Sequence, residues 1–260
     1  MSQPCDVIYG FYNLVDQDTT VLTASDENAF YPVENIQDPR STKVFRSSSA
    51  SASVVFDFIT TEDIDLICVR PNIRTGFGFT GSLTIEANPT DSWGGGAAYS
   101  TTLTPNSDYN FGFLNLAATE SYRFWRITGT GTSYLELSNI FFGQKFQAGK
   151  NFSFNWTFNN TDNSKLTKNK WGDVFIDDYG SLKNINGEVK LLTSTEREAI
   201  NEHFNYTGKT KPFVVIMDNL ELFSTDAEEF AGFFRFKARP GFNNLAFGYF
   251  NTKLQLIEVA

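Results

Sequence analysis

Close pairs of carboxylates are the residues of this chain whose types and spacing come nearest to catalytic chemistry. A glycosidase needs only two carboxyl groups, and side chains two apart on a strand share a face, so Asp63 and Asp65 are a candidate pair. Hard oxygen ligands of this kind would also suit calcium. The plainer interpretation, which we favour, is that these residues begin a strand after a turn. The other close pairs are Asp16 with Asp18 and Asp177 with Asp178.

Other enzyme chemistry has no candidate residues. The only histidine is His203, near the end of a predicted short helix, where we expect a solvated or capping residue. The sequence contains no G-x-S-x-G nucleophile motif, no G-x-x-x-x-G-K-[ST] phosphate loop and no H-E-x-x-H zinc motif. We therefore expect a protein that is not an enzyme, with no catalytic residues, no cofactor and no metal.

Trp93 is the best candidate for an exposed binding platform, because it precedes the flexible run Gly94-Gly95-Gly96. An aromatic ring on such a loop stacks on the apolar face of a sugar, and Arg74 would supply a directional donor beside it. The alternative is that Trp93 folds back over the end of a β-sandwich. These two residues are the candidate ligand-binding residues.

A second candidate surface is basic. The period-2 run that forms it places Arg235, Lys237 and Arg239 between Phe234, Phe236 and Ala238. Such alternation predicts a strand with one buried and one basic face. The formal charge of −9 is uneven, with 8 basic and 16 acidic residues through Lys145 and 13 and 14 afterwards. The basic face would suit the acidic first half of a neighbouring subunit, and a solvated face is the alternative.

Composition limits the other classes of partner and compartment. The 260 residues include 27 Phe, 10 Tyr and 4 Trp, and aromatic rings pack well in strands. Cys5 and Cys68 are too few for a disulfide framework or a metal site, and we expect free thiols, with Cys68 in a buried strand. No secretory signal is visible and no apolar run approaches the length of a membrane span, so we expect neither. An acidic first half disfavours nucleic acid.

The first part of the chain reads as short strands separated by turn-rich loops, without helical periodicity. This spacing is typical of a sandwich or barrel, and we predict an all-β domain over residues 1–145. The predicted strands are Val54–Ile59, Ile64–Arg70, Ser82–Ala87, Tyr122–Thr128 and Tyr134–Phe142.

The segment near Gly143–Asn151 resembles a linker, and we predict a second β domain over residues 146–260 with one short helix. The helix is expected near 195–206, because Thr195 and Glu198 have the spacing of a reciprocal capping box and Gly208 can end it. The predicted strands are Phe152–Phe158, Asp173–Ile176, Val189–Leu192, Phe213–Met217, Gly232–Arg239 and Thr252–Val259. An exposed Asn-rich loop is expected after the first of them.

Two groups of segments resemble known families. The run ENAFYPVENIQDPRSTKVFRS, then VVFDF, SYRFWRITG and LELSNIFFG, resembles the discoidin-like (galactose-binding-like) jelly rolls, especially those of bacteriophage tail proteins. The later run WGDVFIDDYGSLKNINGEVKLLTSTEREAINEHFNYTGKTKPFVVIMD resembles a segment of phage tail-tip and baseplate subunits, of the distal tail kind. The resemblance covers most of the chain.

The resemblance implies an N-terminal jelly-roll sandwich followed by a tail-tube-like β domain with one helix. It further implies a structural subunit of a phage tail tip or baseplate, made in the bacterial host cytoplasm and located in the virion tail. Such a subunit would form a homo-oligomeric ring and dock other tail proteins. The alternative function is carbohydrate binding, in which the jelly-roll loops recognise a host glycan.

Overall fold

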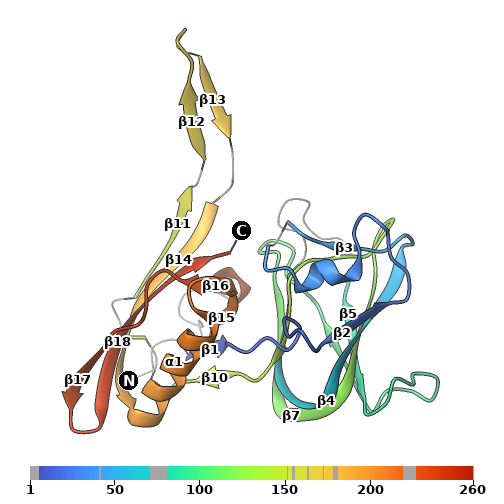
Figure 1. Cartoon of the computed structure of the whole chain (residues 1–260), viewed down its shortest axis with the longest axis horizontal. Helices are drawn as coiled ribbons and strands as arrows, with labels where there is room; N and C mark the ends of the chain where they lie inside the picture. Colours follow the sequence, from blue (N-terminus) through green and yellow to red (C-terminus); the bar gives the residue numbers. More distant parts are fainter. Residues whose placement is uncertain are drawn as a thin grey trace. The chain divides into compact units, whose positions relative to one another are not determined.

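The computed structural model describes residues 6–40, 42–70, 81–150, 152–153, 156–162, 164–171, 173–177, 181–218 and 227–259. The chain is mainly β, with antiparallel strand pairs and one α-helix in the described part, which confirms the predicted fold class (Figure 1). It divides into two compact units. The N-terminal unit comprises 8–147 with 213–232, and the C-terminal unit comprises 1–7, 148–212 and 233–260. The predicted domain boundary at residue 145 stays a prediction, because contacts within one structure do not test independent folding.

The N-terminal unit is built on a six-stranded sheet in the order β2-β4-β7-β5-β6, with β9 paired to β4. Two further short strands, β3 and β8, pair with each other. The strands and the 3₁₀ turn η1 are β2 Val21–Ala24, η1 Val33–Gln37, β3 Phe45–Arg46, β4 Ser51–Val69, β5 Leu83–Asn88, β6 Tyr99–Leu103, β7 Gly112–Thr130, β8 Glu136–Leu137 and β9 Ile140–Gly143. Further elements that lie wholly or mostly in this unit are β1 Asp6–Gly10, β10 Phe146–Gln147, β15 Phe213–Asp218 and η2 Ala227–Phe230.

Aromatic rings form the centre of the N-terminal core. Phe56 of β4, Trp125 of β7 and Phe142 of β9 are completely buried. The Phe142 ring lies 5.0 Å from Phe56 and 5.4 Å from Trp125, between ring centroids. These tilted arrangements are the ones that ring quadrupoles favour. Cys68 is buried in β4 as predicted, and burial raises the pKa of its thiol.

The predicted strands of this unit are right in place but wrong in extent. The segments predicted as Val54–Ile59 and Ile64–Arg70 form one long strand, β4, which contains a register shift between Asp57 and Glu62. Ile59 has a φ of 68° at that shift. The irregular residues interrupt the alternation without ending the strand, which is how a β-bulge reads in a sequence.

The C-terminal unit contains strands in the order β16-β18-β14-β11, with β17 also paired to β18. A separate two-stranded hairpin, formed by β12 and β13, projects beyond β11 and β14 in Figure 1. The bounds are β11 Thr157–Asp162, β12 Lys165–Lys168, β13 Val174–Asp177, β14 Ser181–Thr193, α1 Ser194–Thr207, β16 Gly232–Phe236, β17 Phe242–Ala246 and β18 Tyr249–Glu258.

The N-cap of the helix lies two residues earlier than predicted. Thr193, and not Thr195, is the N-cap, and its partner is Glu196, whose carboxylate accepts the Thr193 backbone N–H at 2.7 Å. Two overlapping Thr-x-x-Glu spacings exist in TSTERE, and the strand β14 runs directly into the first. The C-terminus is as predicted, because Gly208 adopts a φ of 59° and donates its N–H to the Phe204 carbonyl at 2.7 Å.

One face of the helix packs on the sheet. Ile200 is buried, and the Phe204 ring contacts Phe236 edge-on with centroids 5.4 Å apart. Helix α1 contacts β14 and β18. The opposite face of the β14 and β18 sheet carries the exposed side chains Lys253 and Gln255, while Leu254 and Leu256 are buried.

The predicted strand Phe152–Phe158 is wrong in its bounds. Phe152 makes an isolated bridge with Val189, and β11 starts only at Thr157. The stretch predicted as an Asn-rich loop is therefore strand, with Asn159 paired to Asn184. Because β11 ends the strand order, its polar side chains face solvent while its backbone completes the ladder with β14. Positions 154 and 155 lie outside the described residues.

Candidate functional site

The structure describes only one residue of the predicted ligand-binding pair, Trp93. Arg74 lies outside the described residues. Trp93 is half-buried, its Nε1 donates to Asp91 Oδ1 at 2.7 Å, and Arg126 stacks on its ring with Cζ 4.2 Å from the centroid. Arg126 is held in turn by Glu86, at 2.6 Å. The guanidinium therefore covers a face of the ring, and the role of Trp93 in ligand binding stays a prediction.

The carboxylates considered for catalysis have structural uses. Asp63 accepts a hydrogen bond from the Ser121 hydroxyl across β4 and β7. Asp65 accepts the backbone N–H of Lys145 at 2.6 Å. Among the described residues, no group of three or more His, Cys, Asp or Glu side chains is placed to hold a metal ion.

The histidine differs from the expected solvated residue. His203 is half-buried on α1, and burial lowers the pKa of its imidazole to about 4. It is therefore neutral at physiological pH. Burial shifts the pKa of a histidine in this direction, because it disfavours the charged imidazolium.

The predicted basic face is divided. Arg235 is exposed on β16, and Lys237 Nζ lies 3.4 Å from Asn184 Oδ1. Arg239 turns to the helix instead, where its Nη2 donates to Asn201 at 3.2 Å and to Asn205 at 3.4 Å.

The division has a backbone cause. β16 ends at Phe236, and Ala238, predicted to be buried, is exposed. Pro240 follows two residues later and has no N–H for the ladder. The interface role of Arg235, Lys237 and Arg239 stays a prediction, but they do not share one strand face.

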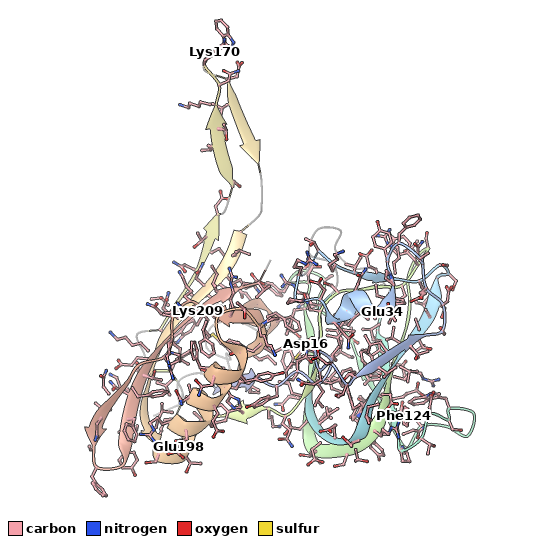
Figure 2. All side chains as sticks on the ribbon, in the orientation of Figure 1. Asp16, Glu34, Phe124, Lys170, Glu198 and Lys209 are labelled. Carbon is pink, nitrogen blue, oxygen red and sulfur yellow. The ribbon has the colours of Figure 1, made fainter. Side chains whose placement is uncertain are left out.

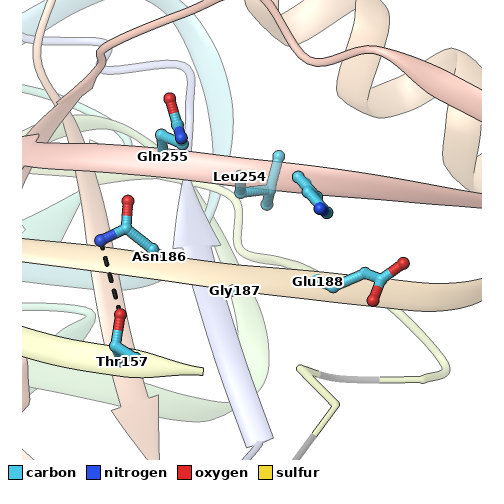
Figure 3. A pocket seen from close by; sticks show the side chains of 7 residues that line it. Thr157, Asn186, Gly187, Glu188, Leu254 and Gln255 are labelled. Carbon is cyan, nitrogen blue, oxygen red and sulfur yellow. Dashed lines mark hydrogen bonds between the residues drawn. The ribbon is translucent and has the colours of Figure 1, made fainter. Parts of the chain in front are cut away.

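A polar hollow of about 270 Å³ lies on the solvent face of this sheet (Figure 3). Asn186 donates to the Thr157 hydroxyl at 3.5 Å across its edge. Glu188 and Lys253 face each other across β14 and β18. The lining residues are Thr157, Asn186, Gly187, Glu188, Lys253, Leu254 and Gln255. The hollow is open and contains no aromatic ring.

A cluster of side chains around one arginine of the N-terminal unit, Arg46, was not predicted. Arg46 of β3 lies between the rings of Tyr31 and Tyr134, with Cζ 4.3 and 4.2 Å from their centroids. Its Nε donates to Oε2 of Glu136 at 2.8 Å, and Glu136 is fully buried. Cation–π contacts with two rings and a buried counterion fix this guanidinium in place.

An exposed aromatic side chain lies on the turn beside the cluster. Asn28 Oδ1 accepts the Phe30 N–H at 2.9 Å, and the Asn28 carbonyl accepts the Tyr31 N–H at 2.8 Å. The Arg46 backbone then pairs with Asn28 and Tyr31. The turn is thus ordered, yet the Phe30 side chain is 87% exposed. An Asn two residues before an aromatic is the signal that could have identified it.

Two hairpins of the C-terminal unit also expose large apolar side chains. Trp171, at the β12–β13 turn, is 78% exposed, and Phe247, at the β17–β18 turn, is completely exposed. The two hairpins lie at opposite ends of the unit in Figure 1. Among the residues whose side chains the structure describes, these hairpins also expose Leu166, Val174, Leu245 and Tyr249. Sequence reasoning missed both surfaces, because it assigned aromatic residues to the core.

No family model and no curated protein matches the chain. A solved family 32 carbohydrate-binding module of NanJ from Clostridium perfringens, in complex with galactose, is 11% identical with a TM-score of 0.42, over 54% of this chain and 99% of the module. The third module of family 32 from a Clostridium perfringens family 31 glycoside hydrolase is 16% identical with a TM-score of 0.42, over 50% and 94%. A Paenibacillus chitosan-binding module is 18% identical with a TM-score of 0.41, over 51% and 99%. Similarities at this level carry no argument about function.

Among the described helices, none is long and apolar enough to cross a membrane.

Proposed function

We propose that this chain is a structural subunit that assembles with further copies of itself through its C-terminal unit. The observation that carries the proposal is the pair of hairpins whose tips expose Trp171 and Phe247. Each tip is accompanied by further exposed apolar side chains on its hairpin, and clustered apolar surface and aromatic residues are features of protein interfaces.

The placement of the hairpins favours assembly over attachment to one flat surface. The tips lie at opposite ends of the same unit, so each would meet a different neighbour (Figure 1). A subunit that uses two different surfaces makes head-to-tail contacts, which close into a ring when the rotation permits. The proposed assembly is therefore a closed ring.

The finer proposal is a tail tip or baseplate subunit of a tailed phage, located in the virion. It is supported by the resemblance of WGDVFIDDYGSLKNINGEVKLLTSTEREAINEHF to subunits of that kind. In this chain the segment forms β13, β14 and the capped helix α1. In such a tail, the N-terminal unit would decorate the ring or dock neighbouring tail proteins.

The test is the molar mass of the purified chain by light scattering over a range of concentrations. The wild type should form a species of several copies, and Phe247→Ser should dissociate it. Val21→Ser, at another exposed apolar side chain on β2, is the matched control and should assemble as the wild type does. A wild type that stays monomeric throughout would refute the proposal.

Carbohydrate recognition is the second candidate, and the exposed Phe30 favours it. A ring held on an ordered turn offers a stacking surface for a sugar at little cost in entropy. The expected result is glycan-array binding by the wild type that Phe30→Ala abolishes without changing the circular dichroism spectrum. Trp93→Ala measures the earlier prediction in the same assay. A wild type that binds no glycan would exclude this function.

A further inference from the structure

The turn between β12 and β13 is held by its own side chains. Asn169 Oδ1 accepts the N–H groups of Trp171 at 2.9 Å and Asp173 at 3.0 Å. Asn169 Nδ2 donates to Asp173 Oδ2 at 2.8 Å, and the Asn169 N–H donates to the Asp173 carbonyl at 3.0 Å. One asparagine thus makes four hydrogen bonds within the turn, which fix the local conformation of the described turn residues.

The exposed side chains at this tip include apolar and basic residues beside the acidic Asp173. Lys170 lies over the exposed Trp171 ring, with Nζ 4.8 Å from the centroid, and Figure 2 shows Lys170 at the end of the hairpin. Lys168 is exposed directly across from Val174, which is also exposed. Tryptophan is the residue that most often dominates an interface. An ordered tip loses little freedom on binding.

The charge of the β12–β13 hairpin indicates which surface of a partner it would contact. The hairpin from Lys165 to Asp177 contains three basic residues, at 165, 168 and 170, and two acidic ones, at 173 and 177, for a net charge of +1 (3 − 2), whereas the chain through Lys145 has 16 acidic and 8 basic residues. The other hairpin has no charged residue from Phe242 to Tyr249. Of the two hairpins, only this one has a net positive charge, which is complementary to the acidic N-terminal unit of a second copy.

We propose that the β12–β13 tip docks on the acidic N-terminal unit of a second copy, with Trp171 as the apolar anchor and Lys168 and Lys170 as the charged contacts. This rests on the proposed self-assembly and assigns one of its interfaces. The interface role of Arg235, Lys237 and Arg239 stays a separate prediction.

The experiment mixes ¹⁴N and ¹⁵N forms of the full chain and treats the assembly with a carbodiimide, which joins lysine to carboxylate directly. The expected product is a mixed-isotope peptide pair that joins Lys168 or Lys170 to a carboxylate in 8–147. Such a pair can form only between two copies. Pairs found only within one isotope, or hairpin links only to other regions, would overturn the proposal.

Variants of the full chain give the second measurement. Lys168→Glu with Lys170→Glu, and separately Trp171→Ala, should each weaken association at least about tenfold, as expected for a central contact. Lys150→Glu with Lys209→Glu reverses two exposed lysines elsewhere on the C-terminal unit and should leave association near the wild-type value. Assembly that persists in the hairpin variants overturns this inference and leaves the proposed function standing. A wild type that never assembles overturns both.

Discussion

Gly187→Ala tests the packing beneath the polar hollow. A Cβ at Gly187 would lie 2.4 Å from Cδ1 and 2.6 Å from Cε1 of Phe152, about 1 Å inside ordinary contact. Phe152 is completely buried and bridges to Val189, so its ring cannot swing into solvent. Overpacking of this kind costs about 1–3 kcal/mol. We therefore expect Gly187→Ala to lower the free energy of unfolding by about 2 kcal/mol.

The assay is equilibrium urea unfolding of the single and double variants. Phe152→Ala alone should cost about 3–5 kcal/mol, but in that background Gly187→Ala should be nearly neutral, because the ring it overlaps is gone. Gly94→Ala is the control, since a Cβ there would have nothing within 4 Å. An equal cost of Gly187→Ala with and without the Phe152 ring would refute the reasoning.

The remaining predictions concern two ionisable groups. His203 has a pKa of about 4 in the fold and 6.5 when unfolded, so its contribution to stability is complete above pH 6.5 and is lost as the pH falls to 4. After allowance for the partial exposure of the ring, the free energy of unfolding should fall by about 1–3 kcal/mol over this pH range. His203→Gln should flatten the dependence of the unfolding free energy on pH between 6.5 and 4.5. An unchanged pH profile would contradict it. Glu136→Gln should cost about 2–4 kcal/mol in urea unfolding, because it leaves Arg46 without its buried counterion, whereas Arg46→Met with Glu136→Leu should cost less. A Glu136→Gln variant as stable as the wild type would show that the pair contributes nothing.

Local patterns determine much of the fold, and the errors lie where two patterns overlap. The side chains of residues 51–58 in β4 alternate strictly between buried and more exposed positions. The helix was predictable from its cap signals and from Gly208, yet TSTERE contains two capping boxes and only the strand before it selects Thr193. The Asn-rich β11 has no strand pattern of its own, because its partner β14 supplies the pairing.

The candidate surfaces were harder to predict, for a different reason. The sequence does not distinguish a buried Phe56 from an exposed Phe30 or Trp171, because burial depends on what the rest of the chain covers. Arg239 illustrates the same limit, since its pattern places it on a strand face and the nearby helix turns it away. Only the short-range spacing from Asn28 to Phe30 and from Asn169 to Trp171 is visible in the sequence.

In the proposed assembly, the chain closes into a ring through its two hairpins. Electron micrographs of the purified full chain, with native mass spectrometry of the same sample, measure this directly. We expect rings with a central channel and a single copy number. Monomers at every concentration would contradict it, and so would rings that form unchanged when Trp171 and Phe247 are both replaced by serine.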